Sequence, residues 1–150
     1  MAHATAHLVL DTNACLDLFV FEDPRAAALR ALLACGRAQA VDDDGCRGEW
    51  LRVLQYPDLA LDAAGIAAAQ ARHAALVRRW DGPGRAPGLP PLPRCRDPDD
   101  QKFLELAARC GARVLVTRDA SLLRLSRRTQ AVAGFVVLPP AAVLALFAEA

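Results

Sequence analysis

Three carboxylates crowd into four positions of the stretch RCRDPDDQKFLELA, which spans residues 94–107. Asp97, Asp99 and Asp100 come directly before an apolar pattern that is typical of an amphipathic helix. Acidic side chains are favoured at helix N-termini, each by roughly 0.3–1 kcal/mol. Carboxylates that are held close together also attract a divalent cation. The stretch is therefore either the cap of a helix or part of a metal site.

The helical phase separates the roles of these acids. Asp97, which a proline follows, is a favourable N-cap, and Asp99 falls in the first turn. Counting three and four residues on from Asp100 reaches Phe103 and Leu104, on the apolar face of the helix. We therefore expect Asp100 to point toward the buried side, which a metal ligand requires and a capping acid does not.

Two further acids follow apolar runs that are typical of buried strands. Asp11 ends the run HLVLD, with Asn13 two positions later, and Asp119 comes just after the run RVLVT, which ends at Thr117. Ligands of open parallel sheets bind beyond the carboxyl ends of the strands. If these two strands are neighbours, the two carboxylates converge. An Asp at a strand–helix junction is also a common turn or capping residue, so each acid alone is ambiguous.

A fourth acid, Glu49, lies in the first turns of a predicted helix over residues 46–57. Alone it is typical of an exposed helix residue, but with Asp11, Asp100 and Asp119 it makes a set of four acids near helix starts. Two carboxylates about 4 Å apart repel by roughly 4 kcal/mol at an effective dielectric constant of about 20, and a divalent cation removes that cost. Oxygen ligands select Mg²⁺ or Mn²⁺ over zinc. Such ions hold phosphate oxygens and activate water for in-line attack.

The elements that must position these acids alternate along the chain. Apolar runs predict strands over residues 7–11, 38–41, 113–117 and 135–138. Helical spacing predicts helices over residues 23–36, 46–57, 62–80, 98–110, 121–128 and 139–150. Residues 81–93, rich in Pro and Gly, predict an irregular connection that could hide one short strand. Continuously apolar strands between helices predict an α/β fold with a parallel sheet covered on both faces, in a single domain over residues 1–150.

Composition restricts the classes of function. The chain has 150 residues, of which 54% are hydrophobic, which suits a folded domain and excludes a disordered chain. We find neither a membrane-spanning run nor a signal-peptide pattern and expect a cytoplasmic protein. Five cysteines without a CxxC pair predict reduced thiols rather than a disulfide framework or a zinc site. The net charge of +1 gives no global basic field that would announce a nucleic-acid partner.

The motifs in combination resemble those of a known family. The chain contains, in the family's order, LVLDTN (8–13), GEWLRVLQYP (48–57), CRDPDDQKFLELA (95–107) and VLVTRDASLL (114–123). This combination is similar to that of PIN-domain ribonucleases, in the branch of toxin components of toxin–antitoxin systems. The resemblance covers most of the chain, and its specificity lies in the combination, because any one motif alone is weak.

The resemblance implies a site and an activity. It places the family's acidic metal-binding quartet on Asp11, Glu49, Asp100 and Asp119. It matches Asn13 and Thr117 to polar positions that orient those acids or a bound water, and Asp97 could reach a second metal. It implies a three-layer PIN-like sandwich with four or five parallel strands and Mg²⁺- or Mn²⁺-dependent endonucleolytic cleavage of single-stranded or structured RNA. Homodimers and a small antitoxin protein that blocks the site are frequent in the family.

Two other interpretations stay open from the residues. A phosphatase of the haloacid dehalogenase type also carries an Asp after its first strand, but it needs a second Asp where this chain has Asn13. It also needs a Lys near the site, and Lys102, the only Lys, is expected off the inward helix face. The other alternative is a non-catalytic module that binds RNA or a partner on the same fold. Four intact acids disfavour it, because a pure binder would gain stability by losing their repulsion.

Arginine accounts for seventeen of the 18 basic residues, which is what a GC-rich genome would produce. Arginine also suits contacts with phosphate. Arg118, beside Asp119, and Arg96, beside Asp97, are the candidates for contact with an RNA backbone.

Overall fold

The structure is a computed structural model, and it describes residues 5–148. Its single sheet has five parallel strands in the order β3-β2-β1-β4-β5. The strands are β1 (Ala6–Leu10), β2 (Ala38–Asp42), β3 (Val77–Arg79), β4 (Val114–Val116) and β5 (Val136–Leu138). The α/β fold class with a parallel sheet is therefore confirmed.

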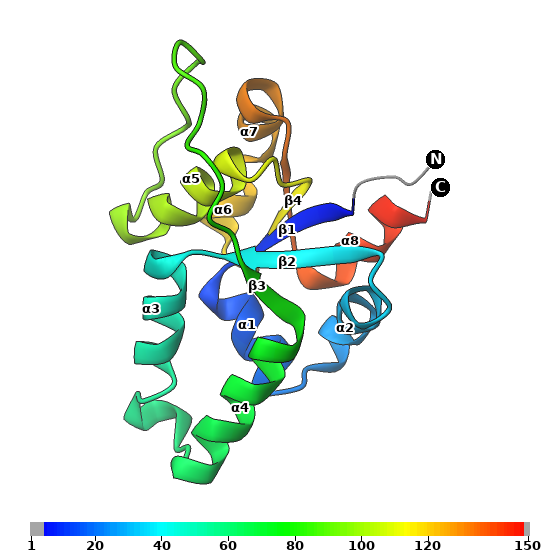
Figure 1. Cartoon of the computed structure of the whole chain (residues 1–150), viewed down its shortest axis with the longest axis vertical. Helices are drawn as coiled ribbons and strands as arrows, with labels where there is room; N and C mark the ends of the chain where they lie inside the picture. Colours follow the sequence, from blue (N-terminus) through cyan, green and yellow to red (C-terminus); the bar gives the residue numbers. More distant parts are fainter. Residues whose placement is uncertain (1–4, 149–150) are drawn as a thin grey trace.

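Helices cover both faces of this sheet and make a three-layer sandwich (Figure 1). One face carries α1 (Thr12–Phe19), α2 (Ala27–Ala34), α4 (Ala63–Leu76) and α8 (Pro140–Phe147). The other carries α5 (Gln101–Arg109), α6 (Ala120–Leu123) and α7 (Ser126–Ala133). Helix α3 (Asp44–Val53) contacts α1 and α5. Short 3₁₀ turns are η1 (Pro24–Ala26), η2 (Pro57–Leu59) and η3 (Pro98–Asp100).

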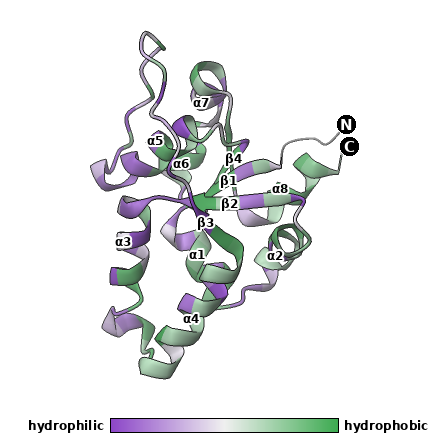
Figure 2. Ribbon diagram, viewed as in Figure 1, coloured by the Kyte–Doolittle hydropathy of each residue, from purple (hydrophilic) through white to green (hydrophobic). Residues whose placement is uncertain are grey.

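The central strand β1 shows why a strand that is covered on both faces is an apolar run. Leu8 and Leu10 of β1 belong to the core on one side of the sheet, and Val9 belongs to the core on the other side. Each fully buried aliphatic side chain of this kind contributes roughly 1.5–3 kcal/mol. Figure 2 shows the hydrophobic strands at the centre and hydrophilic residues at the segments that lead into α3 and α5.

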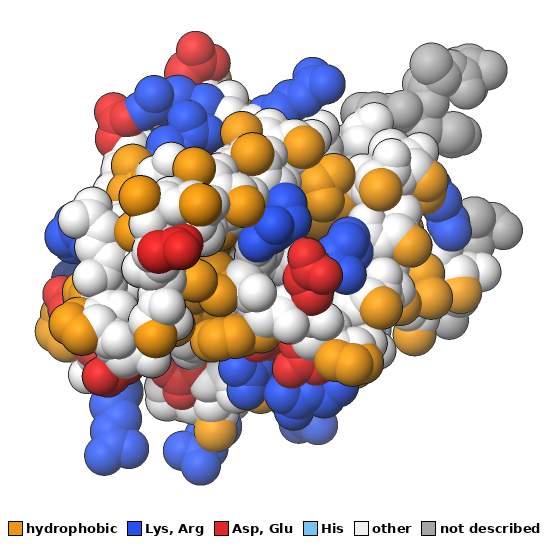
Figure 3. Space-filling model, turned by 90° about the horizontal axis from the view of Figure 1, so that it is seen from below, with side chains coloured by type: hydrophobic (Ala, Val, Ile, Leu, Met, Phe, Trp, Pro, Cys, Tyr) orange, Lys and Arg blue, Asp and Glu red, His pale blue; other side chains and the backbone are white. Residues whose placement is uncertain are grey.

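The surface is mixed in character. In Figure 3, which views the molecule from below, acidic and basic side chains interrupt the hydrophobic ones across the visible face. This mixture is in keeping with the net charge of +1. In the part of the chain that the structure describes, no helix is both long enough and apolar enough to span a membrane.

The expectation of a helix over residues 62–80 was wrong at its end. Helix α4 stops at Leu76, and β3 begins at once, with Val77 opposite Ala40 of β2. The strand that residues 81–93 could have hidden therefore lies just before them, and residues 80–97 contain neither helix nor strand. Apolar spacing cannot separate a helix end from a short strand, and pairing with β2 decides for the strand.

The sequence interpretation also left out α1. Its eight residues, TNACLDLF, follow β1 after a single residue, so the strand runs almost directly into a helix. The helix is too short for its periodicity to stand out, and it is stable because one side packs into the core through Ala14 and Leu18. This tight strand–helix junction positions the first candidate acid.

Candidate active site

The strand order creates a crevice at the carboxyl ends of β1 and β4. The chain runs from β1 to β2 and β3 on one side, then crosses back to β4 and β5 on the other. Ligands of such sheets bind where the order reverses. Leu10 pairs with Val116, and the Asp11 N–H donates to the Val116 carbonyl at 3.0 Å. Asp11 and Thr117 therefore leave the sheet side by side at the reversal point.

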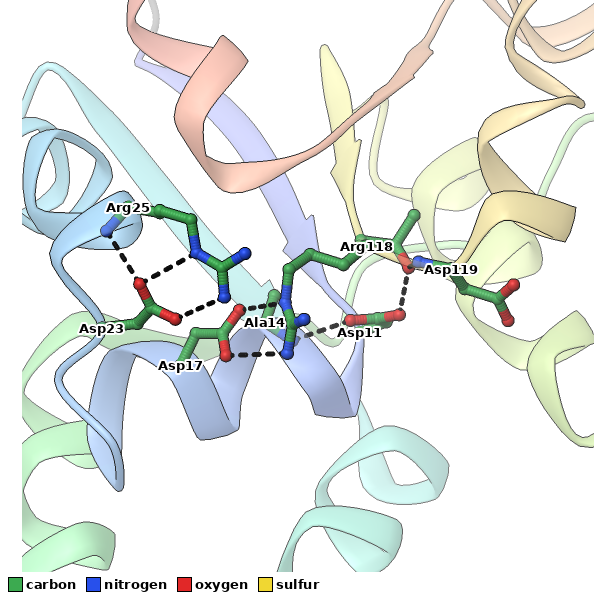
Figure 4. A network of polar contacts seen from close by, with 8 residues as sticks. Asp11, Ala14, Asp17, Asp23, Arg25, Arg118 and Asp119 are labelled. Carbon is green, nitrogen blue, oxygen red and sulfur yellow. Dashed lines mark hydrogen bonds and ion pairs between the residues drawn. The ribbon is translucent and has the colours of Figure 1, made fainter.

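Asp11 is held rigidly in this crevice (Figure 4). It is 4% exposed, and its Oδ1 accepts the Ala14 N–H at 2.8 Å, which caps α1. Its other oxygen accepts the hydroxyl of Thr117. The Thr117 Oγ1 in turn accepts the Asp119 N–H at 2.9 Å. Thr117 thus ties the backbone at Asp119 to the side chain of Asp11.

Hydrogen bonds also fix the side chains of Asp119 and Glu49. Asp119 caps α6, and its Oδ1 accepts the Ser121 N–H and hydroxyl, both at 2.8 Å. Glu49, on α3, accepts the Thr12 hydroxyl on one oxygen and the Lys102 ammonium at 2.8 Å on the other. The Thr12 hydroxyl therefore orients Glu49, a role for Thr12 that the sequence interpretation did not single out.

The three acids of the stretch 97–100 have separate environments. The Asp97 side chain accepts the Asp99 N–H at 2.9 Å, so Asp97 is the cap, as the sequence predicts. Asp99 is exposed, whereas Asp100 is half-buried and its carboxylate makes no capping hydrogen bond. Capping explains the first of these acids and leaves Asp100 without a structural role of that kind.

A single cavity of about 340 Å³ joins these elements. Its lining includes the four acids of the predicted quartet, Asp11, Glu49, Asp100 and Asp119. Asn13 of α1 and Asp58 of η2 also line it, and Asp58 is an acid that sequence analysis missed because it lies in an ordinary-looking Pro-Asp turn. Asp97, Arg96 and Arg118 are not among the lining residues.

Comparison with known proteins assigns this architecture to a family. The sequence profile described as PIN domain matches residues 7–121, which include the whole candidate quartet. The chain belongs to the PIN domain family. PIN domains are generally metal-dependent nucleases that act on nucleic acid. The assignment removes the haloacid dehalogenase interpretation. No curated protein matches the chain.

Negative charge in this PIN domain is poorly compensated at Asp11. Burial is the main reason that its pKa rises from 3.8 to about 6. The hydrogen bonds from Thr117 and Ala14 lower the pKa. The charges of Asp100 and Asp119 raise it further, which means that the three carboxylates sense one another across the cavity.

The pKa of the Asp100 carboxyl is raised for similar reasons. Its pKa also rises to about 6, first through desolvation and then through repulsion from Asp97, Asp119 and Glu49. The ammonium of Lys102 acts in the opposite direction. Two carboxyl pKa values that are raised by burial and by neighbouring carboxylates indicate buried negative charge that a cation would stabilise.

The donor set fits a hard divalent cation. All of the candidate ligands are carboxylate oxygens, which suit Mg²⁺ or Mn²⁺. Among residues 5–148, no three Asp, Glu, His or Cys side chains already converge closely enough to hold an ion. Glu49 is turned toward Thr12 and Lys102, and Asp119 toward Ser121. Binding of an ion therefore requires side-chain rotation.

The helical phase predicted the wrong position for the ammonium group of Lys102. We expected it off the inward face, yet its ammonium donates to Glu49 at 2.8 Å and to the Asp99 carbonyl at 2.6 Å. Its long flexible stem lets the charge reach around the helix. Its being the only Lys among 18 basic residues could have drawn attention to it.

The two arginines proposed for RNA contact, Arg118 and Arg96, lie in different environments. Figure 4 shows Arg118 reaching to Asp17, whose oxygens accept from its guanidinium at 2.6 and 3.0 Å. Asp17 is 2% exposed, and a buried carboxylate needs such a partner. Arg118 therefore joins α1 to the end of β4, which favours a structural role. Arg96 is exposed on the segment that enters η3.

The raised pKa of Asp11 predicts an unusual pH dependence of stability. Its pKa is about 6 in the folded protein and near 3.8 when unfolded, so between these values the folded state binds more protons. Metal-free protein should therefore lose stability through this group as the pH rises from about 4 to about 6, by on the order of 2–3 kcal/mol.

Urea unfolding in EDTA, at pH values from 4.5 to about 7.5, measures this loss. Because other acids titrate in the same range, the useful quantity is the difference in unfolding free energy between the parent and Asp11→Asn. The parent should fall behind the variant as the pH rises. A difference that stays constant across this range would contradict the assignment of a raised pKa to Asp11.

Proposed function

We propose that this PIN domain is a Mg²⁺- or Mn²⁺-dependent endoribonuclease that hydrolyses RNA phosphodiester bonds. The observation that supports it most is that Asp11, Glu49, Asp100 and Asp119, from four separate segments, line one cavity at the reversal point of the sheet. The choice of RNA over DNA rests on the resemblance of the motifs to those of PIN-domain ribonucleases.

The roles of the acids follow from their environments. Asp11, Asp100 and Asp119 would hold the ion, with Glu49 at the rim and Asp97 within reach of a second one. When bound, the ion would neutralise the carboxylates, hold a phosphate oxygen and lower the pKa of the attacking water. Thr117 keeps the Asp11 carboxylate in a single orientation, which is the support that metal ligands require.

Lys102 adds a positive charge at the edge of the acidic cavity. Its ammonium lies 2.8 Å from Glu49, so it fixes that carboxylate and partly offsets its charge. A fixed cation beside the cavity would also favour the negative charge that builds up on phosphoryl oxygens during hydrolysis. Asn13, at the start of α1, is exposed toward the same cavity and could hold a water or a phosphate oxygen.

The proposal extends to biological context. By the resemblance to toxin components, the nuclease would act in the cytoplasm as the toxin of a toxin–antitoxin pair. A cognate antitoxin protein would then block the cavity, and the nuclease could form a homodimer.

A cleavage assay tests the proposed function. Purified protein with a labelled RNA and Mn²⁺ should release fragments, EDTA should abolish the release, and excess Mn²⁺ should restore it. Cleavage that EDTA does not affect would point to a contaminating ribonuclease. Binding of RNA without cleavage at any Mg²⁺ or Mn²⁺ concentration would favour the non-catalytic module instead.

A further inference from the structure

The cavity is lined by two chemically different sets of side chains. One set is the carboxylates, which include Asp58 of η2, and the other, called the apolar side here, is made of apolar and aromatic side chains. This apolar side consists of Leu16, Val53, Tyr56, Leu59 and Phe103. A phosphodiester needs only the acidic side, so the apolar side is available to another part of the substrate.

Tyr56 is the most exposed large side chain on the apolar side. It is 54% exposed, although a tyrosine ring gains from burial. Its backbone is held at both ends, because its N–H donates to the Val53 carbonyl at 3.0 Å and its carbonyl accepts the Leu59 N–H at 3.1 Å. Pro57 follows and begins η2. The ring is therefore carried by a rigid turn, which reduces the entropy lost when a ligand packs against it.

We propose that Tyr56 forms a nucleobase subsite, on which the base next to the scissile phosphate stacks. This inference rests on the proposed nuclease function and names its substrate class. Each phosphate in an RNA chain is flanked by bases within one nucleotide, so a phosphate at the acids places a base near the apolar side. A flat aromatic ring accepts any base by stacking, without reading its sequence.

The subsite selects unpaired RNA. In a duplex each base is stacked between its neighbours, and its face is unavailable to a side chain. A base can reach Tyr56 only if it is splayed out of a strand, as in single strands, loops and bulges. The size of the cavity, about 340 Å³, is at the lower end of the range of about 300–1,000 Å³ for ligand pockets, which suits one base with its phosphate.

Phe21 provides a matched control. It is 55% exposed, almost the same as Tyr56, but it follows α1 in the chain and does not line the cavity. Exposed aromatic area alone therefore predicts equal effects for Tyr56→Ala and Phe21→Ala, whereas a base subsite predicts an effect for Tyr56→Ala only.

Cleavage of a single-stranded oligoribonucleotide in Mn²⁺ measures the effect. Tyr56→Ala should lower kcat/KM roughly 5- to 150-fold, equivalent to about 1–3 kcal/mol for one stacked base. Tyr56→Phe keeps the ring, so its kcat/KM should stay within about threefold of that of the parent. The kcat/KM of Phe21→Ala should equal that of the parent. With the parent protein, removing the base beside the cleaved bond from the oligonucleotide should lower kcat/KM by the same factor. With Tyr56→Ala, removing that base should cause no further loss of activity.

Binding provides a readout that does not depend on turnover. In an Asp11→Asn background, Tyr56→Ala should weaken the binding of the single strand by the same factor and leave binding of the duplex unchanged. Failure of the parent to cleave any RNA would refute the proposed function, and this binding comparison would still test the subsite.

Three results would overturn the subsite. One is equal binding and cleavage by Tyr56→Ala and the parent, and another is an equal loss in Phe21→Ala. The third is a variant whose only defect is weaker inhibition by an antitoxin protein, which would make the apolar side a protein-docking surface.

Discussion

Replacing Asp11 with Asn is expected to lower metal-dependent RNA cleavage by on the order of 100-fold or more, at unchanged fold. Loss of a group that merely supports a metal ligand costs about 10–100-fold, and loss of a ligand should cost at least as much. Asp11 is the most enclosed of the four candidate acids, at the reversal point between β1 and β4. No neighbouring carboxylate occupies its place at the end of β1.

The substitution keeps the local structure. An Asn oxygen can accept the Ala14 N–H that caps α1, since Asn and Asp are similarly good N-caps. The amide nitrogen can donate to the Thr117 hydroxyl, which is able to accept as well as donate. A circular dichroism melt in EDTA should therefore show no loss of stability in the variant.

The control for this experiment is Asp99→Asn. It removes the same charge from an exposed acid beside the site, one that does not line the cavity. Its cleavage rate should remain within about twofold to threefold of the parent, because exposed charges contribute weakly. Full activity in Asp11→Asn, in a preparation free of contaminating ribonuclease, would falsify the assignment of Asp11.

Binding of Mn²⁺ is expected to stabilise the folded protein substantially. An ion that binds only the folded state adds roughly 2.7 kcal/mol at a hundredfold excess over its dissociation constant. For a domain of this size, that corresponds to a rise of about 5–10 °C in melting temperature. The physical source is the burial of the Asp11 and Asp100 carboxylates, which is the main reason that their pKa values are raised, together with the repulsion that Asp119 adds.

Variants that remove one repelling charge should be more stable than the parent in EDTA, yet should gain less stability than the parent from Mn²⁺. Asp100→Asn should raise the melting temperature in EDTA, because its carboxylate is desolvated and makes no capping hydrogen bond. The same variant should gain less from Mn²⁺, because one ligand is gone. Asp119→Asn should follow the same pattern, whereas Asp99→Asn should resemble the parent in both conditions.

A helix-capping role makes the contrary prediction. If the acids only capped helices, each substitution would lower stability with or without metal, and Mn²⁺ would have no effect on the parent. Thermal melts of the parent and the three variants in EDTA and in Mn²⁺, at fixed ionic strength, separate the two. Melting temperatures of the parent that do not respond to Mn²⁺ would refute a metal site at these carboxylates.

Local patterns in the sequence were sufficient for the parallel α/β sheet and for the candidate acids. The buried strands β1 and β4 are visible as apolar runs, because a strand covered on both faces has no polar side. The placement of Asp11 and Asp119 after these strands needs only the rule that parallel strands end at the same edge. The difference between Asp97 and Asp100 needs only the helical repeat. Each of these features depends on neighbours within a few residues in the chain.

The tertiary structure decided the features that depend on distant residues. Residues 77–79 became β3 instead of the end of a helix because β2 offers them a partner, a choice that periodicity cannot express. Lys102 reaches Glu49 across 53 residues of sequence, and Arg118 reaches Asp17 across 101. The apolar side around Tyr56 combines side chains of α1, α3, η2 and α5. Pairing and side-chain reach are set by the packing of whole elements against one another, so the sequence alone determined which acids are available and the folded structure determined what surrounds them.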